Sequence, residues 1–106
     1  MTSGPEAPVG AATTGSGERY VLAVDLGTGG PKVAVVSTAG RIVAHGFAGV
    51  PLHLLDGGGA EQDPADWWSA ICSAAGDALA GAAIPPADFI GVGCTSQWSG
   101  TVAVGA

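Results

Sequence analysis

Basic residues are scarce in this sequence. Its 106 residues include only three, Arg19, Lys32 and Arg41, against nine acidic residues, so the formal net charge is −6. A protein that binds nucleic acid through a charged face needs a cluster of Lys and Arg side chains to neutralise phosphates. We therefore expect no nucleic-acid partner, and the scattered acidic residues mainly favour solubility.

Cysteine and long apolar runs are also scarce. Cys72 and Cys94 lie far apart without a Cys-x-x-Cys companion, and His45 and His53 lack the spacing of a metal-binding pair. We expect both thiols to be buried and both imidazoles to lie on the surface. No apolar run approaches the roughly 18 residues of a membrane span, and no secretory leader pattern begins the chain. We therefore expect no membrane partner and a cytoplasmic location.

Large side chains are missing from the first 17 residues, which are mostly Gly, Ala, Pro, Ser and Thr. This segment has too little apolar surface to offset the entropy lost on ordering, so residues 1–17 are predicted to form a flexible tail. Residues 18–106 are expected to fold, and their length suits one small domain and no more.

The sequence does contain a series of short apolar runs, of which the first two are rich in Val. Those at 19–26, 32–38 and 42–48 predict three strands in an antiparallel meander, because β-branched residues favour strands and short turns join the runs. In the second run, apolar side chains alternate onto both faces. Both faces of the sheet should therefore be covered in the working protein.

A helix is predicted after the long connection 49–62, in which three adjacent glycines suggest mobility. Asp63 suits the N-cap, Pro64 the first helical position and Asp66 the first turn, while region 81–86 ends the helix. An apolar stripe at helical spacing is expected to pack in the core. Its members are Trp68, Ile71, Cys72, Ala75, Leu79 and Ala82.

Two further strands are predicted near the end of the sequence. The run at 89–94 follows the helix, so we expect it to pair in parallel with the first strand, and 101–104 is expected to form one more. The order β-β-β-α-β-β supplies one helix, whereas a sheet with two apolar faces needs two covering layers. We expect the chain to be the truncated first part of a larger α/β domain.

The turn between the first two strands is too rich in glycine to be ordinary filler. Gly27, Gly29 and Gly30 allow positive φ and close approach of a ligand, and successive N–H groups in such a turn can surround an anion. Lys32 adds a charge suited to phosphate, and Asp25 lies at a strand end where it could face a hydrated cation. A phosphate-binding hairpin is therefore predicted. The alternative is a plain glycine hairpin whose polar residues cap the strands.

Two better-known phosphate loops do not fit this turn. A P-loop needs Gly before its Lys and Ser or Thr after it, whereas Lys32 lies between Pro31 and Val33. The dinucleotide fingerprint needs a third glycine at the position of Lys32, and a helix rather than a strand after it.

Three segments in order resemble the N-terminal part of the FGGY carbohydrate kinases, and most closely the xylulokinase-like members. They are Val-Asp-Leu-Gly-Thr-Gly-Gly-Pro-Lys at 24–32, Ala-Glu-Gln-Asp-Pro-Ala-Asp-Trp-Trp at 60–68 and Ile-Gly-Val-Gly-Cys-Thr-Ser-Gln-Trp-Ser-Gly at 90–100. This resemblance implies an α/β domain of the ribonuclease-H-like type found in the actin, hexokinase and sugar kinase superfamily.

The resemblance also implies an activity, namely transfer of the γ-phosphoryl group of ATP, with Mg²⁺, to a hydroxyl of a sugar or polyol. By that analogy the phosphate would be held by Gly27, Thr28, Gly29 and Gly30, with Lys32 offsetting charge and Asp25 placing Mg²⁺. The sugar pocket would be lined by Gln97, Trp98, Ser99 and Gly100. Phosphoryl transfer depends mainly on alignment and charge stabilisation, which such groups supply.

The chain departs from the family pattern at several positions. Gly29 and Gly30 replace frequent hydroxyl residues, Pro31 removes a backbone donor, and Ser99 stands where xylulokinase-like members carry His. Trp98 stands where those members have Met.

The family's catalytic base and adenine site lie further along its chain, so no catalytic residue is assigned here. We expect little turnover without the remainder of the kinase. The alternatives are a non-catalytic relic that binds phosphate or sugar, and an ATPase of the same superfamily.

Overall fold

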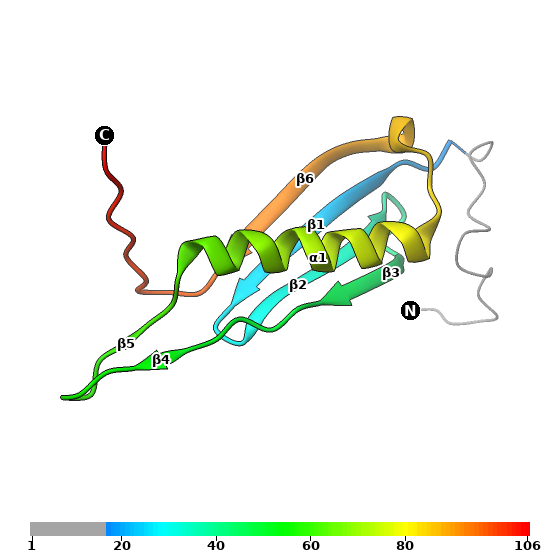
Figure 1. Cartoon of the computed structure of the whole chain (residues 1–106). Helices are drawn as coiled ribbons and strands as arrows, with labels where there is room; N and C mark the ends of the chain where they lie inside the picture. The colour runs from blue at the N-terminus through cyan, green and yellow to red at the C-terminus, as the bar shows by residue number, and fades with distance from the viewer. Residues whose placement is uncertain (1–16) are drawn as a thin grey trace.

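A computed structural model of the chain describes residues 17–106, so the tail expected at 1–17 lies, apart from Gly17, outside the described residues. The chain forms a four-stranded sheet, and a helix lies across it in Figure 1. Its strands are β1 (Tyr20–Gly27), β2 (Gly30–Ser37), β3 (Ile42–Phe47) and β6 (Phe89–Ser96). They lie in the order β3-β2-β1-β6. The first three pair in antiparallel fashion and β6 pairs with β1 in parallel, so both predicted pairings are confirmed.

Helix α1 (Pro64–Ala82) begins as the sequence predicts. The Asp63 carboxylate accepts a hydrogen bond from the N–H of Ala65 at 2.9 Å, and Asp66 lies in the first turn. The carboxylate satisfies one of the backbone donors that a helix start leaves unpaired. The helix ends at Ala83, whose φ is +54°, a left-handed cap formed here without a glycine.

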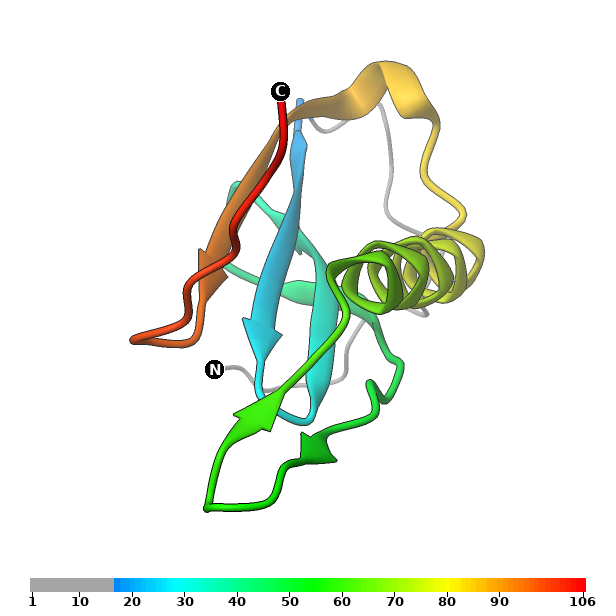
Figure 2. The same ribbon diagram turned by 60° about the vertical axis from the view of Figure 1, so that its left-hand side comes forward.

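The helix packs on one face of the sheet, over β2 and β3, as Figure 2 shows nearly end-on. Its buried residues are Ala70, Ala74, Ala78 and Ala82. A Cβ added at Gly46 of β3 would collide with the carbonyl oxygen of Ala74, so small residues on both elements permit this close approach.

The stripe predicted to pack in the core is therefore only partly correct. Ile71, Ala75 and Ala82 contact the core, but Trp68 and Leu79 are 67% and 40% exposed and Cys72 is exposed. The alanine row lies beside the predicted stripe on the helix and overlaps it at Ala82. Helical spacing alone does not decide between two such neighbouring faces, because the shape of the sheet selects the side chains that fit.

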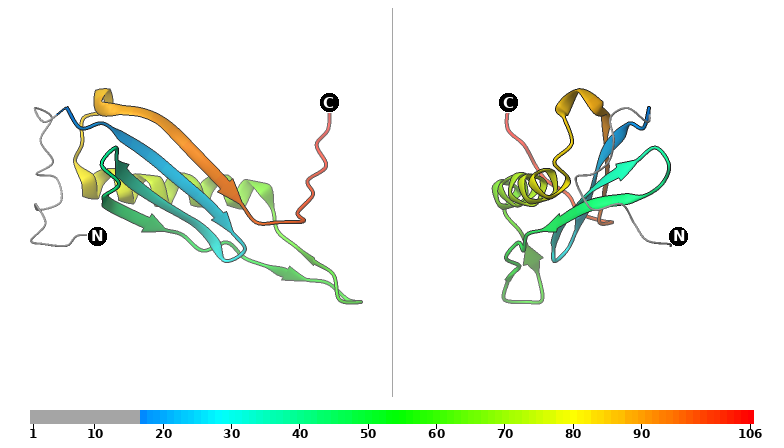
Figure 3. Two further views of the ribbon diagram at one scale, coloured as in Figure 1. Left: turned by 180° about the vertical axis from the view of Figure 1, so that it is seen from behind. Right: turned by 90° about the vertical axis from the view of Figure 1, so that its right-hand side faces the viewer.

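The core lies between α1 and the sheet and is built on valines. Its fully or nearly buried members are Tyr20, Val24, Val33, Val35, Val43, Ala74, Ala78, Ala82 and Ile84. The other face of the sheet has no covering layer among residues 17–106, as the view from behind in Figure 3 shows. One helix thus covers one face only, as the order of the predicted elements indicates. Cys94 of β6 is exposed, as is Cys72, so the prediction of buried thiols is wrong.

The long connection before the helix contains a short hairpin that the sequence did not predict. It consists of β4 (His53–Leu54) and β5 (Ala60–Glu61), and it projects beyond the end of the sheet in Figure 1. Gly57 and Gly58 have φ of +86° and +91° and form its tip. These glycines make a tight turn, because residues with a Cβ rarely adopt such angles.

Residues 97–106 form no strand, so the strand predicted at 101–104 is wrong. Val102 and Val104 are 42% and 86% exposed. An apolar run becomes a strand only where a neighbour supplies hydrogen bonds and packing, and none pairs with this run among the described residues. No helix in residues 17–106 is long and apolar enough to cross a membrane.

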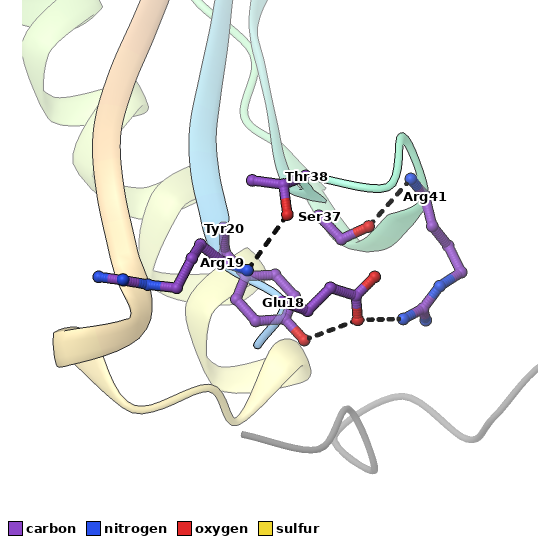
Figure 4. Close-up of polar contacts among 6 residues, drawn as sticks. All are labelled: Glu18, Arg19, Tyr20, Ser37, Thr38 and Arg41. Atoms are coloured by element: carbon purple, nitrogen blue, oxygen red, sulfur yellow. Dashed lines mark hydrogen bonds and ion pairs between the residues drawn. The ribbon is translucent and has the colours of Figure 1, made fainter. Parts of the chain in front are cut away.

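Polar side chains clustered at the start of β1 form hydrogen bonds that link this strand to the turn between β2 and β3 (Figure 4). The Glu18 carboxylate accepts hydrogen bonds from the Tyr20 hydroxyl at 3.4 Å and the Arg41 guanidinium at 3.1 Å. The N–H of Arg19 donates to the Thr38 hydroxyl at 3.2 Å. Burial raises the pKa of Tyr20, and the charge of Glu18 raises this pKa further. The cluster thus depends on a neutral phenol and a charged Arg41.

Candidate functional site

The glycine turn joins β1 to β2 through Thr28 and Gly29, with Gly27 and Gly30 paired across the strands. Gly30 has φ +139°, and a Cβ added there would collide with the carbonyl oxygen of Ala48. Only glycine fits this position, because both the backbone angle and the neighbouring backbone forbid a side chain.

In the turn, the backbone carbonyl groups of Thr28 and Gly29 have hydrogen-bond partners, whereas their N–H groups do not have them within residues 17–106. The carbonyl oxygen of Thr28 accepts from the Gln62 side chain at 2.8 Å, and that of Gly29 accepts from the N–H of Val50 at 3.1 Å. The N–H groups of Thr28 and Gly29 donate to no partner among residues 17–106. The two carbonyl groups already accept hydrogen bonds, whereas the two N–H groups have no acceptor within residues 17–106. This arrangement favours an anion as ligand.

Lys32 and Asp25 lie opposite each other on β2 and β1, both exposed. The Lys32 ammonium lies over the turn, because a Cβ added at Gly27 would be 3.6 Å from its Nζ. Asp25 and Lys32 form no ion pair with each other. The other two basic residues of the chain already have partners, since Arg41 pairs with Glu18 and Arg19 donates to the carbonyl of Ala87 at 3.3 Å. Lys32 is therefore the cation left for a ligand at this turn.

A concavity of about 440 Å³ surrounds this charged pair. Asp25, Lys32, His45, Phe47 and Thr95 are among the residues that line it. Strand alternation places Asp25 and Lys32 on the same face as the half-buried Ala23 and Ala34, away from α1. No cluster of three or more His, Cys, Asp or Glu side chains able to hold a metal exists among the described residues. One carboxylate suits Mg²⁺ that is held mainly by water and phosphate oxygens.

The segment after β6 lies against the same turn from the other side. The N–H of Gln97 donates to the carbonyl of Leu26 at 2.9 Å, and the Thr28 hydroxyl donates to the Gln97 side-chain oxygen at 2.6 Å. Trp98 is 93% exposed, and Ser99 has φ +59°. A second pocket, of about 360 Å³, includes Thr28, Glu61, Gln62, Trp67 and residues 97–102 in its lining.

The structure thus divides the predicted site residues between two hollows. Thr28 and residues 97–100 line one pocket, whereas Asp25 and Lys32 line the concavity on the uncovered face of the sheet. The glycine turn lies between the two groups, so a ligand on each side could contact it.

Comparison with known sequences identifies the family. The N-terminal domain of the FGGY family of carbohydrate kinases matches residues 20–106. The chain belongs to this family. A glycerol kinase from Trichormus variabilis is 35% identical over 85 residues, which are 80% of this chain and 17% of that protein. A glycerol kinase from Ralstonia nicotianae is 37% identical over 83 residues, 78% of this chain and 17% of that protein. The chain thus spans about a sixth of the length of these curated relatives.

Two residues at the centre of this candidate site were not predicted as site residues. Gln62 bonds to the turn, and the Trp67 indole N–H donates to Gln62 at 3.2 Å. Both lie in the segment 60–68 that carries the family resemblance, where Asp63, Pro64 and Asp66 received roles at the helix start and Trp68 a place in the apolar stripe. Their position within that motif was the available signal.

Proposed function

We propose that this chain is the N-terminal part of an ATP-dependent kinase that transfers the γ-phosphoryl group to a hydroxyl of a sugar or polyol. Its membership of the FGGY family and its similarity to glycerol kinases support this proposal. The observation that carries it is the polarity of the turn, whose Thr28 and Gly29 N–H groups have no partner within residues 17–106 and lie close to the Lys32 ammonium. We propose further that the sheet begins a ribonuclease-H-like domain of a cytoplasmic enzyme.

On the nucleotide side, the residues of the turn bind and align the phosphate. The free N–H groups of Thr28 and Gly29 donate to its oxygens, and Gly27 and Gly30 let these oxygens approach the backbone. Lys32 offsets the negative charge of the phosphate, and Asp25 is the residue that would hold Mg²⁺ there. Mg²⁺, when bound, supplies neutralisation of charge on the phosphate oxygens. Alignment and charge stabilisation of this kind account for most of the catalysis of phosphoryl transfer.

On the acceptor side, residues 97–100 form part of the pocket for the sugar or polyol. The exposed Trp98 indole offers an apolar face to a carbon skeleton, while Gln97 and Ser99 can bond to hydroxyl groups. The curated relatives that we compared are glycerol kinases, whereas the sequence motifs most resemble xylulokinase-like members. We therefore propose a polyol or sugar and keep the xylulokinase-like assignment as a prediction.

None of the described Asp residues is proposed as catalytic base. Asp63 caps α1 and Asp66 lies in its first turn, so both have structural roles. Complete turnover is therefore proposed to need the remainder of the kinase as partner.

A binding experiment on the 106-residue chain tests the nucleotide side. In ¹⁵N–¹H NMR, a non-hydrolysable ATP analogue with Mg²⁺ should shift the amide resonances of Thr28 and Gly29 most strongly. Shifts confined to other parts of the chain would contradict the proposal. For the acceptor side, residues 20–106 can replace the matching segment of the Trichormus variabilis glycerol kinase. ATP consumption should then depend on an added polyol or sugar, and a folded chimera that hydrolyses ATP equally well without one would favour an ATPase.

A further inference from the structure

Four side-chain hydrogen bonds join three segments that are distant in the sequence. Gln62, just before α1, donates from Nε2 to the carbonyl of Thr28 at 2.8 Å. Its Oε1 accepts from the Trp67 indole at 3.2 Å and from Nε2 of Gln97 at 3.3 Å. The Thr28 hydroxyl closes the ring by donating to Oε1 of Gln97 at 2.6 Å. Gln62 is thus the only residue of the four that bonds to each of the other three.

The Trp67 indole fixes the direction of every bond in this ring. An indole N–H can only donate, so it requires Oε1 of Gln62 and leaves Nε2 of Gln62 to face the Thr28 carbonyl. Reversing the Gln97 amide would oppose its oxygen to Oε1 of Gln62, two acceptors without a proton. Gln97 therefore presents its own oxygen to Thr28, and the Thr28 hydroxyl must donate.

With this direction of the bonds, the Gln97 oxygen and a bound phosphate would compete for one proton, that of the Thr28 hydroxyl. The Thr28 hydroxyl has a single proton, and in this structure the proton lies in the bond to Gln97. A phosphate oxygen at the turn can accept this proton only if the hydrogen bond from the Thr28 hydroxyl to Gln97 breaks. The Gln97 oxygen, which lines the pocket beside Glu61 and Trp98, then needs another donor. A polyol hydroxyl in the pocket can supply that donor.

We propose that Gln62 is a positioning residue that couples the phosphate turn to the pocket of residues 97–102. An anion at the turn and a polyol in the pocket each strengthen the binding of the other through the Thr28 hydroxyl. This inference rests on the proposed function, because it needs a phosphate at the turn. Coupling between two sites is reciprocal, so the same factor appears in whichever order the ligands bind.

The experiment titrates the ¹⁵N-labelled 106-residue chain with inorganic phosphate and with glycerol, singly and together. Phosphate alone should shift the amides of Thr28 and Gly29 and also the Gln97 side-chain NH₂ and the Trp67 indole resonance. Saturating phosphate should lower the dissociation constant of glycerol about fivefold, at the lower end of typical coupling between sites.

Gln62→Met removes all three hydrogen bonds of Gln62 and keeps the side-chain length and charge. We expect both ligands still to bind this variant, with a coupling factor near one. The matched control is His53→Met, because His53 is exposed on the neighbouring β4 and makes no side-chain hydrogen bond within residues 17–106. The control should keep the fivefold factor and the position of the Trp67 indole resonance.

Separate outcomes decide the proposed function and this inference. If phosphate leaves the Thr28 and Gly29 amides unshifted, the phosphate turn itself is refuted, and the coupling with it. If phosphate and glycerol both bind but neither changes the affinity of the other, the turn stands and the coupling through Thr28 is refuted. This measurement on the unchanged chain decides the question even if Gln62→Met fails to fold.

Discussion

Replacing Gly30 with alanine should destabilise the folded chain strongly, for two independent structural reasons. The φ of +139° lies where residues with a Cβ are strained by about 1–3 kcal/mol. The new methyl group would also collide with the Ala48 carbonyl oxygen, and backbone shifts forced by overpacking typically cost a further ~1–3 kcal/mol. We expect a loss of about 3–4 kcal/mol, a large fraction of the roughly 5–15 kcal/mol that stabilises a domain.

Gly29→Ala, one residue away in the same turn, is the matched control. Its φ is not in the left-handed region, and a Cβ there meets nothing within 4 Å. Such a change should be neutral or stabilise the fold by up to about 1 kcal/mol, because alanine restricts the unfolded chain. Urea unfolding followed by far-UV circular dichroism measures both variants against the unchanged chain. Equal midpoints for Gly30→Ala and Gly29→Ala would refute the conformation described for the turn.

Three further predictions concern separate features. Lys32→Ala should weaken phosphate binding at the turn about tenfold, since a charge-assisted contact is lost, and an NMR titration of the Thr28 amide that gives an unchanged dissociation constant would contradict the role of Lys32. Asp63→Ala should lower the free energy of unfolding by about 1 kcal/mol through loss of the N-cap bond to Ala65, and urea unfolding with Asp56→Asn as surface control checks this. The pKa of Tyr20 is raised in the folded chain, so the unfolded chain ionises first as the pH rises. The resulting stability is fully present below the unfolded pKa of about 10 and is lost above it, a decline that Tyr20→Phe should reduce in unfolding curves from pH 8 to 11.

The strands and the start of the helix could be predicted because their signals are local. The apolar runs of β1, β2 and β3 each pair with the next run along the chain across a short turn, and the Asp63-Pro64 pair starts α1 locally. The parallel return of β6 followed from the helix before it. These elements need only neighbours in the sequence, and the structure agrees with them.

The errors concern features that depend on a distant partner. The alanine face of α1 was not predicted because Gly46, on β3, decides how closely the helix can lie. Cys94 is exposed because α1 packs on β2 and β3 and does not cover β6. The spacing of apolar residues in the sequence does not reveal which strands the helix covers. The expected strand at 101–104 lacks a neighbour among the described residues. In each case the surface that meets the residue, and not its own propensity, decides the outcome.

The candidate site shows the same division between local and distant causes. Strand alternation and the register of the hairpin place Asp25 and Lys32 together, and both could be inferred from the sequence. Gln62 reaches Thr28 across 34 positions, and Thr28 reaches Gln97 across 69, so their ring appears only once the chain is folded.

This division also determines what each group of the turn can do. Thr28 lies in the turn itself, outside the strand alternation that directs Asp25 and Lys32 to the uncovered face. Its backbone N–H and its side chain can therefore serve different hollows, and its hydroxyl already bonds to Gln97 in the pocket. When a phosphate oxygen accepts the Thr28 hydroxyl proton without a polyol present, the Gln97 oxygen loses its donor, so the hydroxyl adds little net phosphate affinity. Without a polyol, phosphate affinity should therefore survive Thr28→Ala better than Lys32→Ala, because the loss of the Lys32 charge is not compensated in this way.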